Sequence, residues 1–509
     1  FDMPYLYNRA LNLGISKNEI PLILQRSMVT LKHGVHIDLY RTFSNRSIQI
    51  YAFNHKYSEH TLNAISKCLI NESKIDFDGS IAELPLYELA RYCHNDSRLT
   101  LKLTSFSNDL LMKLLVVISR VGRMSIDDIS RFGVSQWIRS MLYFEHRKQN
   151  ILIPRREELQ MKGQASSTAL MKDKKYRGGF VVEPQAGVHF NVMVLDFASL
   201  YPSIIKVYNL SYDTVRCVHD ECKSNIIPET EHWVCKKRKG IESLLIGSLR
   251  DLRVNYYKHL SKDKSLSDNE KDLYSIISQA LKVILNASYG VMGAEIFPLY
   301  CLPVADATAS VGRYTITKTI EKCKALGIEV VYGDTDSVFI KFSRDDKDGN
   351  EIKDKNKLLK HCINCGIESG KFVDETLRPP QNLEYEKTFY PFILISKKRY
   401  TGDKYELSAD KPKERTSMGI VMKRRDNAQI VKYVFGNVVE IIMHQKSVDK
   451  AMVWLQETLQ KIIDGKIEES MFIISKSLSG YYKNPGGIAH KVLADRMAER
   501  NPGNKPKPN

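Results

Sequence analysis

The sequence predicts a multidomain α+β protein, and three observations support that class. The chain has 509 residues, of which 43% are hydrophobic, so it can bury several cores rather than one. Short runs rich in β-branched residues flank aspartate-containing turns and predict strands. Residues 240–262 and 270–289 have helical spacing and predict two long antiparallel helices with a polar linker. No apolar run reaches the roughly 18 residues that span a bilayer, so we expect no membrane partner.

The stretch Tyr332–Phe339 is the centre of the predicted active region. It follows Val330 and Val331 and reads Tyr-Gly-Asp-Thr-Asp-Ser-Val-Phe, which predicts a hairpin about a tight Gly-Asp turn. Asp334 and Asp336 then lie at its tip, where two carboxylates repel each other unless a cation lies between them. A hard, oxygen-seeking ion such as Mg2+ suits that position. Asp-x-Asp alone also describes a solvated turn, so the interpretation depends on other stretches.

A second stretch, Val192–Ile205, predicts a buried strand that ends at Asp196 and a helix that begins near Pro202. It contains Asp-Phe-Ala-Ser-Leu-Tyr-Pro-Ser-Ile, and Lys282–Gly290 reads Lys-Val-Ile-Leu-Asn-Ala-Ser-Tyr-Gly. With Tyr-Gly-Asp-Thr-Asp-Ser, these motifs resemble those of the family B DNA polymerases very closely and occur in the same order. In that family the two aspartate motifs hold the catalytic metals, and the resemblance extends over essentially the whole chain.

The resemblance implies a right-hand polymerase with palm, fingers and thumb, preceded by the C-terminal part of an RNase H-like 3′-5′ exonuclease domain. The expected divisions are a partial exonuclease domain at 1–115, linking helices at 116–170, palm at 171–239 and 293–408, fingers at 240–292 and an incomplete thumb at 409–509. We therefore expect a fragment that lacks the N-terminal part and the end of the thumb of a longer protein.

The composition agrees with that interpretation. A formal net charge of +17 favours a polyanionic partner such as DNA, although general solubility explains part of it. Nine cysteines in a chain of this length, without a leading signal peptide, favour a reducing compartment over a disulfide framework. We expect the cytoplasm if the source is archaeal and the nucleus if it is eukaryotic.

Two stretches near the start resemble exonuclease motifs of the family. Phe1–Leu6 resembles the second motif and contributes Asp2, and Tyr92–Thr100 matches the third, in which Tyr92 and Asp96 lie four residues apart. On a helix that spacing puts both side chains on one face, where a metal-bound carboxylate and a phenol can address one phosphate. A buried tyrosine beside a surface aspartate is the alternative. The first motif, Asp-x-Glu, should lie upstream of residue 1, so we expect little proofreading by this chain.

Two further stretches resemble the family's contacts with DNA. Tyr176, Gly178 and Gly179 match the Tyr-x-Gly-Gly segment that contacts the template, and paired glycines let the backbone approach a phosphate. A plain turn is the alternative. A second stretch is similar to the Lys-Lys-x-Tyr motif that grips the duplex, and alternating basic and aromatic residues on a short strand suit phosphate contact; a solvated charge run is the alternative. Its residues are Lys397, Lys398, Arg399 and Tyr400.

The two predicted long helices resemble the fingers, and Ser267 with Glu270 makes a capping box that starts the second. Flexible or forked cations on these helices suit a triphosphate. Arg250 and Lys258 could share the role of Arg253, because the alignment is uncertain within one turn. The positions that match nucleotide contacts of the family are Arg253, Lys282, Asn286, Tyr289, Ser199, Leu200 and Tyr201.

Tyr201 has a more specific expected role. In the family this tyrosine packs against C2′ of the incoming sugar, where a ribose hydroxyl would collide with the ring. The resemblance therefore makes Tyr201 the steric gate against ribonucleotides. An aromatic wedge in the palm core is the alternative.

A cluster of potential metal ligands lies between Val215 and Arg238. Cys222, Cys235 and one or both histidines have spacings that allow a tetrahedral Zn2+ site. The family does not require zinc here, and ordinary free thiols are the alternative. The full set is Cys217, His219, Cys222, His232 and Cys235.

Together these features predict a template-directed DNA polymerase that moves nucleotides from dNTPs to a primer 3′-hydroxyl in replication. Two Mg2+ ions would be held chiefly by Asp196 and Asp336, with Asp334 close by and the Phe197 carbonyl as a further ligand. The expected partners are primer-template DNA, dNTPs and, in the full-length protein, a sliding clamp; that protein would also proofread. One rival is an inactive polymerase fold that only binds DNA, which substituted metal carboxylates would reveal. The other is a reverse transcriptase or RNA polymerase, against which the Ser-Leu-Tyr-Pro-Ser segment argues.

Overall fold

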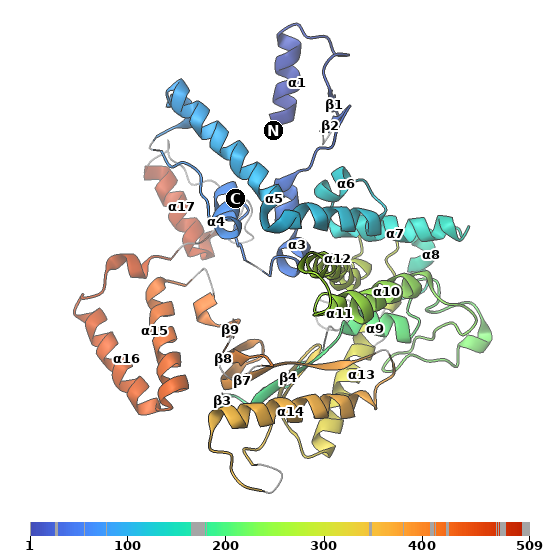
Figure 1. Ribbon diagram of the computed structural model, residues 1–509, viewed down its shortest axis with the longest axis vertical. Helices are drawn as coiled ribbons and strands as arrows, with labels where there is room; N and C mark the ends of the chain where they lie inside the picture. Colours follow the sequence, from blue (N-terminus) through green and yellow to red (C-terminus); the bar gives the residue numbers. More distant parts are fainter. Residues whose placement is uncertain are drawn as a thin grey trace. The chain divides into compact units, whose positions relative to one another are not determined.

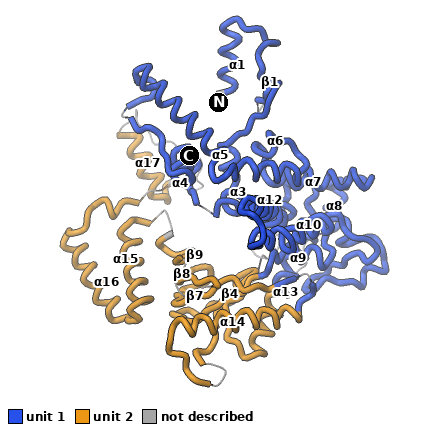
Figure 2. The backbone as a smooth tube through the Cα atoms, in the orientation of Figure 1, with its two compact units in different colours: residues 1–179, 197–315, 377–382 blue, residues 180–196, 316–376, 383–509 orange. Residues whose placement is uncertain are grey.

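The computed structural model describes residues 2–25, 29–54, 56–77, 79–163, 179, 181–345, 349–379, 381–407, 412, 414–423, 427–474, 476, 478 and 485–500. The chain forms two compact units (Figure 2). Unit 1 comprises residues 1–179, 197–315 and 377–382, and unit 2 comprises residues 180–196, 316–376 and 383–509. Each unit is therefore assembled from segments that are far apart in the sequence. None of the helices in these described ranges has the length and apolar character needed to cross a membrane.

Unit 1 begins with a helix and a small antiparallel strand pair. These are α1 (Asp2–Asn12), β1 (Leu22–Leu24) and β2 (Val29–Leu31). Tyr7 and Ile20 pack with the strands in a small core of their own.

Helices make up the rest of unit 1. Within α5 (Leu86–Gly122), residues 106–109 leave the helical conformation, so two helical segments meet at a kink. The second segment packs with Trp137 and with Ile276 and Ala280 in one hydrophobic core. The other helices up to residue 160 are α2 (Leu39–Ser44), α3 (Arg46–Tyr51), α4 (Leu62–Leu69), α6 (Ile126–Arg131), α7 (Val134–Lys148) and α8 (Arg156–Gln160).

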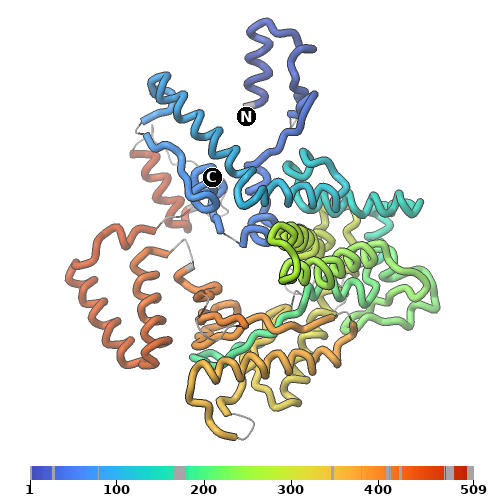
Figure 3. The backbone as a smooth tube through the Cα atoms, viewed as in Figure 1, coloured from blue at the N-terminus to red at the C-terminus, as the bar shows by residue number. Residues whose placement is uncertain are grey.

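The two long helices predicted from spacing are both present in unit 1 (Figure 3). The first is α10 (Ile241–Asp251), which continues through a π-helical segment, Leu252–Tyr257, into α11 (Lys258–Leu260). The second, α12 (Asp268–Met292), returns against the first. It starts at the predicted capping box, in which the Ser267 hydroxyl accepts from the backbone N–H of residue 270 and the carboxylate of that residue accepts from the Ser267 N–H. Local sequence signals therefore determined these helix limits well, but not the π-helical segment.

Unit 2 is built on an antiparallel sheet. Within the described residues the sheet has seven strands, in the order β5-β6-β4-β7-β8-β9 with β3 on β7. The strands are β3 (Gly187–His189), β4 (Val192–Phe197), β5 (Glu329–Asp334), β6 (Ser337–Lys341), β7 (Leu383–Ser396), β8 (Arg399–Tyr405) and β9 (Glu414–Met418). Together with the helices of both units, this sheet confirms the predicted α+β class.

The two faces of this sheet are covered by different parts of unit 2. Val192 and Val194 pack with the aromatic rings of Phe339, Phe389, Phe392 and Tyr400 on one face. Met193 and Leu195 alternate to the other face, which α14 (Lys355–Asp374) covers (Figure 1). A Cβ at Gly366 would collide with Met193, so this glycine permits the close helix–sheet approach. By the same alternation, Asp196 lies on the face opposite α14.

The remaining part of unit 2 is helical. Arg415 of β9 connects the sheet to α15, because its guanidinium contacts both Asp403 of β8 and Glu440 of α15. The helices of this part are α15 (Gln429–Glu440), a π-helical segment at Ile441–Gln445, α16 (Val448–Ile463) and α17 (Ala489–Arg500).

Candidate functional site

Three aspartates meet at one end of the sheet of unit 2. Asp196 pairs with Ser337 across β4 and β6, and Asp334 pairs with the same Ser337 across β5 and β6. Directly paired residues point to the same face of a sheet, so Asp196 and Asp334 share the face opposite α14. Asp336 immediately precedes Ser337, in the turn that joins β5 to β6. Strand register therefore unites the two motifs that the sequence analysis singled out.

The turn differs from the predicted Gly-Asp turn. Asp334 is the last paired residue of β5, so the turn residues are Thr335 and Asp336, and Thr335 takes a positive φ of 56°. Gly333 stays in the strand, where a Cβ would lie 2.8 Å from Cγ2 of Val182. The glycine therefore serves close packing rather than the turn, which is why the turn prediction was wrong in position.

Asp334 already has partners for both of its oxygens. Lys398 Nζ lies 3.2 Å from Oδ1, and Thr335 Oγ1 donates to the same oxygen over 3.0 Å. The Tyr332 hydroxyl donates to Oδ2 over 3.4 Å. By contrast, no hydrogen bond or ion pair from another described residue reaches the carboxylate of Asp196 or Asp336.

The two open carboxylates have raised pKa values. Burial raises the pKa of Asp196 to about 8, and the nearby charges of Asp336 and Glu386 add to the rise. Burial raises the pKa of Asp336 to about 6, and the nearby charges of Asp334 and Glu386 add to the rise. The Asp336 side chain is exposed at the turn tip, and its own backbone N–H and the charge of Lys398 oppose the rise in its pKa. The repulsion within this group disfavours full ionisation unless a cation is present.

The available donor atoms suit a hard divalent cation. Asp196 and Asp336 present carboxylate oxygens with which no described cation forms an ion pair, and the Phe197 carbonyl follows Asp196 directly in the chain. Carboxylates and carbonyls are the ligands that Mg2+ accepts. This part of the sheet therefore fits Mg2+ better than zinc, for which imidazole and thiolate ligands are usual.

Sequence reasoning missed an acidic residue of this region. Glu386 on β7 contributes to the raised pKa of both Asp196 and Asp336. Glu384, two residues earlier on the same strand, also acts on Asp196. The alternation of Glu384 and Glu386 was a detectable period-2 signal, but only strand order shows that β7 lies next to β4.

The residues predicted to contact the nucleotide lie in unit 1. Tyr201 of α9 (Leu200–Val207) packs on Tyr289 of α12, with ring centroids 4.4 Å apart. Lys282, Asn286 and Tyr289 are spaced by four and three residues, which places them on one face of α12. The Tyr201 ring also fits closely against Gly312 of α13 (Leu302–Ala325), where a Cβ would lie 2.9 Å from Cε1.

Arg253 has the geometry of a positioned cation. It lies in the π-helical segment, and its Nη1 donates to the Ser199 hydroxyl over 2.9 Å. Arg250, which could have shared the role of Arg253, is 2% exposed; its Nε donates to Ser203 and its Nη1 pairs with Asp251 over 3.1 Å. Arg250 is thus a structural residue and is not available to a phosphate. Lys258 begins α11 and is partly exposed, and Leu200 is buried.

The predicted DNA contacts are only partly described by the structure. Tyr176 and Gly178 lie outside the described residues, and Gly179 is exposed. The sequence predicted that Lys397 and Lys398 lie on a short strand. In the structure they form the turn between β7 and β8. Their positions follow from pairing of the flanking residues 396 and 399, which ends the ladder.

The side chains of this turn have distinct environments. Lys397 Nζ lies 2.6 Å from a carboxylate oxygen of Glu183, and Lys398 pairs with Asp334. Arg399 is exposed. Tyr400 is 7% exposed and packs in the aromatic core, with its ring 5.4 Å from that of Phe392.

The exonuclease-like residues lie in unit 1. Tyr92 and Asp96 share one face of α5, as predicted. The contacts that both side chains make with Lys74 show this. Lys74 Nζ is 2.7 Å from Asp96 Oδ2 and 4.6 Å from the centroid of the Tyr92 ring. Asp2 belongs to α1, and its side chain lies outside the described residues.

Four of the five predicted zinc-ligand candidates come together in unit 1. The ligand atoms of Cys217, His219, Cys222 and Cys235 all lie within 4.8 Å of one another. His232 does not join them, which corrects the prediction. Its Nδ1 accepts a hydrogen bond of 2.9 Å from Arg216 and its Nε2 lies 3.1 Å from Asp306, so both ring nitrogens have partners.

Comparison with known proteins yields one family. The family model described as DNA polymerase family B matches residues 128–508. DNA polymerase 1 of Sulfurisphaera ohwakuensis is 38% identical over 501 residues, which cover 95% of this chain and 54% of that protein. DNA polymerase 1 of Aeropyrum pernix is 39% identical over 513 residues, covering 98% of this chain and 51% of that protein.

More distant relatives agree. The DNA polymerase delta catalytic subunit of Candida albicans is 29% identical over 547 residues, covering 99% of this chain and 50% of that protein. The chain thus spans about half the length of the curated relatives it matches. The solved structure of the family B DNA polymerase from the hyperthermophilic archaeon Pyrobaculum calidifontis has a TM-score of 0.65 at 24% identity, covering 100% of this chain and 62% of that one. That likeness concerns the fold.

Proposed function

The chain belongs to family B of the DNA polymerases, and we propose that it carries out template-directed DNA synthesis in replication. The reaction would transfer a nucleotide from a dNTP to the 3′-hydroxyl of a primer. The observation that supports it most directly is the pair formed by Asp196 and Asp336. Strand register brings these residues to the same end of the sheet, and no side chain of another described residue is paired with either carboxylate.

The carboxylates would act as ligands for Mg2+, together with the Phe197 carbonyl. Two Mg2+ ions held there would lower the pKa of the attacking 3′-hydroxyl and would neutralise charge on the triphosphate and the leaving pyrophosphate. Asp334 has a different part: its contacts with Lys398 and Tyr332 hold the turn that carries Asp336. A fixed turn keeps the carboxylate of Asp336 in place without reorganisation during the reaction.

The residues of unit 1 would bind the nucleotide. Arg253 and Lys282 are cations suited to the phosphates, and the hydrogen bond from Arg253 to Ser199 orients the guanidinium before substrate arrives. Asn286 is exposed on the same face of α12 as Lys282. Tyr201 would close off the 2′ position of the sugar, while Leu200 and Tyr289 would support that ring.

DNA and protein partners follow from the same proposal. The chain's net charge of +17 favours primer-template DNA, with Lys397, Lys398 and Arg399 near the duplex. Tyr400 would support their turn from the core, and Tyr176, Gly178 and Gly179 would meet the template. In a longer protein, Asp2, Tyr92 and Asp96 would belong to a proofreading exonuclease, and a sliding clamp would hold the enzyme on DNA. The compartment would be the cytoplasm of an archaeon or the nucleus of a eukaryote.

Primer extension by Asp196→Ala and Asp336→Ala variants tests the proposal. Removing a metal-binding carboxylate removes several kcal/mol of charge stabilisation, so the extension rate should fall by at least about a thousandfold. Duplex affinity should persist or increase, because a negative charge is lost. The matched control is Glu329→Gln at the other end of β5, where an exposed ion pair with Lys341 is lost instead. This control should extend primers at the wild-type rate.

Two results would argue against the proposal. Near wild-type extension by either aspartate variant would remove that residue from catalysis. A wild-type chain that binds primer-template tightly but never extends it, with Mg2+ and all four dNTPs present, would instead indicate a DNA-binding scaffold. Circular dichroism of each variant confirms that the sheet is intact.

The role of Tyr201 is tested by sugar choice. A clash between the ring and a ribose hydroxyl costs a few kcal/mol, which corresponds to roughly a hundredfold bias against rNTPs. Tyr201→Val should relax that bias while some dNTP insertion remains, whereas Tyr201→Phe keeps the ring and should keep the bias. Single-nucleotide insertion of matched dNTP and rNTP measures both. Equal discrimination by the wild type and Tyr201→Val would place Tyr201 away from the sugar.

A further inference from the structure

The connection between α9 and α10 is long for a segment without regular structure. Residues 208–240 are all described, yet they contain only a short 3-10 turn, Asp220–Cys222, and isolated β-bridges. Irregular connections longer than about 12–15 residues are uncommon in compact domains unless they have a function of their own. Backbone hydrogen bonds within this segment, such as those from the N–H of Arg216 to the Trp233 carbonyl and from the N–H of Cys235 to the Thr214 carbonyl, bring its distant parts together.

Four potential metal ligands converge in this segment. Cys217, Cys222 and Cys235 are buried, His219 is partly exposed, and their ligand atoms lie within 4.8 Å of one another. The Cys235 sulfur and His219 Nδ1 are 3.5 Å apart. In a tetrahedral zinc site with Zn–S distances of about 2.3 Å, neighbouring ligand atoms are about 3.8 Å apart. The Cys235–His219 pair thus has nearly that spacing, and no pair of the four atoms is farther apart than 4.8 Å.

We propose that the thiolates of Cys217, Cys222 and Cys235 and the Nδ1 of His219 bind one Zn2+ ion. Three sulfurs and one imidazole nitrogen fill the four positions of a closed site, so the ion would be structural rather than catalytic. The thiols lose their protons to solvent when the ion binds. The proposed site shares no residue with the group proposed to bind Mg2+.

One contact to the Cys222 sulfur favours a thiolate. The backbone N–H of Lys236 donates to the Cys222 sulfur over 3.3 Å, and N–H donors of this kind stabilise a metal-bound thiolate. Zn2+ with three thiolates carries a net charge of −1. Directly after Cys235 the chain has a run of four basic residues, which adds positive charge beside the cluster, although Lys237 is already paired with Glu221 and Arg238 with Asp213. They are Lys236, Lys237, Arg238 and Lys239.

A disulfide explains the cluster less well than an ion does. A disulfide would join two of the three thiols. It would not explain why the third thiol and His219 lie beside them. Among the described residues no cysteine forms a disulfide, and these three are buried as free thiols. An ion uses all four groups.

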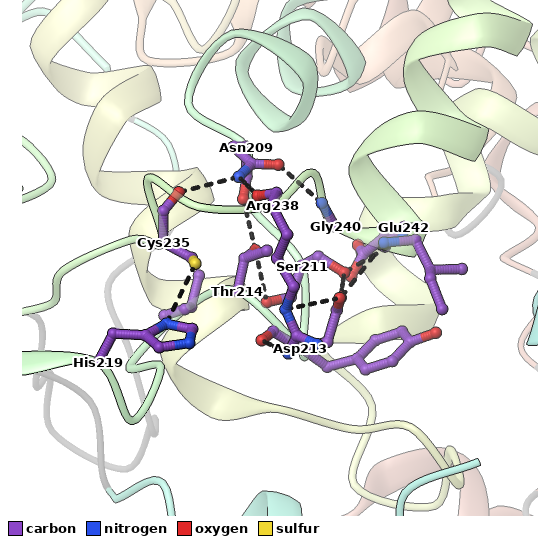
Figure 4. A network of polar contacts seen from close by, with 12 residues as sticks. Asn209, Ser211, Asp213, Thr214, His219, Cys235, Arg238, Gly240 and Glu242 are labelled. Atoms are coloured by element: carbon purple, nitrogen blue, oxygen red, sulfur yellow. Dashed lines mark hydrogen bonds and ion pairs between the residues drawn. The ribbon is translucent and has the colours of Figure 1, made fainter. Parts of the chain in front are cut away.

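A hydrogen-bond network holds the Cys235 end of the cluster (Figure 4). The Asn209 side-chain amide donates to the carbonyls of Cys235 and Arg238, over 3.2 and 2.9 Å. Asn209 Oδ1 in turn accepts from the Gly240 N–H over 2.9 Å, at the start of α10. Bound zinc would therefore connect residues 217–222 to the base of α10, the helix that leads to Arg253. The ion would thus stabilise the fold of this part of unit 1.

Metal analysis of the 509-residue chain tests the site. The chain is expressed with zinc in the medium, purified under reducing conditions without a chelator, and analysed by plasma mass spectrometry. We expect about one equivalent of zinc per chain. Exchange with Co2+ should produce the visible ligand-field bands of a tetrahedral site and a thiolate charge-transfer band in the ultraviolet.

Variants separate binding from folding. His219→Cys keeps four ligands and should retain zinc, whereas Cys217→Ser should not bind it. A chelator should lower the Tm of the wild type but leave the Tm of Cys217→Ser unchanged. Cys301→Ser, at a buried cysteine of unit 1 outside the cluster, should retain zinc, as should His232→Gln. Less than about a tenth of an equivalent in wild-type protein would overturn the proposal, as would iron in place of zinc or a Cys222–Cys235 disulfide in the intact mass.

Discussion

Asp336 in unit 2 and Asp96 in unit 1 were both predicted as metal ligands, but their surroundings differ. Asp96 is paired with Lys74 at 2.7 Å, and the same lysine covers the ring of Tyr92. Asp336 forms no ion pair with a described residue, and the charges of Asp334 and Glu386 resist its ionisation more than the charge of Lys398 favours it. One aspartate is already neutralised by the protein, and the other is left for a cation from solution.

The two regions show that motif spacing and charge compensation are separate properties. The four-residue spacing on α5 placed Tyr92 and Asp96 on one face, as expected for a helix, but did not indicate that Lys74 would meet both. The strand register of β4, β5 and β6 instead gathers negative charge without a balancing partner at Asp196 and Asp336. Only the second arrangement suits an incoming divalent cation, and each prediction below compares the two.

Magnesium should stabilise the chain through the carboxylates of unit 2 alone. At pH 8, saturating Mg2+ should raise the Tm by a few degrees, because a ligand that binds only the folded state adds about 2.7 kcal/mol at a hundredfold excess over Kd. Asp196→Asn and Asp336→Asn should lose most of this increase, and Asp96→Asn should keep it. Differential scanning calorimetry with and without Mg2+ measures the effect. A loss of equal size in Asp96→Asn would erase the distinction between the regions.

The same contrast should be visible in the pH dependence without metal. The folded-state pKa of Asp196 is about 8 and that of Asp336 about 6, both above the unfolded value of about 4. Between roughly pH 4 and 8 the folded chain therefore binds more protons than the unfolded chain, and its free energy of unfolding falls as pH rises. Asp196→Asn should flatten that fall and Asp96→Asn should not. Buried Glu242, with a pKa also raised to about 8, contributes a parallel fall in every variant, so differences between variants in EDTA are the informative measurement. An unchanged slope in Asp196→Asn would contradict the assignment.

The basic turn of unit 2 and Lys74 of unit 1 should differ in DNA binding. Replacing Lys397 and Lys398 by alanine should flatten the log–log dependence of primer-template affinity on salt by about one unit per lost phosphate contact. Lys74→Ala should leave the slope unchanged, because that lysine is engaged by Asp96. Fluorescence anisotropy across a salt series gives the slopes. If the double variant keeps the wild-type slope, these lysines serve only Glu183 and Asp334.

The smallest expected effect concerns nuclease activity. With Lys74 neutralising Asp96, the chain should degrade a labelled single strand at about the background rate, and Asp96→Ala should not change that rate. Gel analysis of the strand over several hours is sufficient. Strong 3′-5′ degradation that disappears in Asp96→Ala would show that Asp96 binds a metal despite Lys74.

The sequence alone determined the features that depend on neighbours along the chain. The capping box at Ser267, the strand that carries Asp196 and the hairpin that carries Asp336 all follow from local signals, such as hydrophobic alternation, capping and helical spacing. The predicted face of Tyr92 and Asp96 was correct for the same reason. Long motifs also predicted the family, since they specify residue type at many consecutive positions.

Tertiary structure decided every feature that requires a partner from elsewhere in the chain. Pairing of Asp334 with Ser337 moved the turn to Thr335 and Asp336, and Val182 gave Gly333 a packing role. His232 is bonded to Arg216 and Asp306 and so lies outside the cysteine cluster. Arg250 is buried, and its guanidinium contacts Ser203 and Asp251. The charge and burial of a side chain, and the hydrogen-bonding or ligand positions that it leaves free, depend on groups brought close by folding. Sequence spacing does not give those distances.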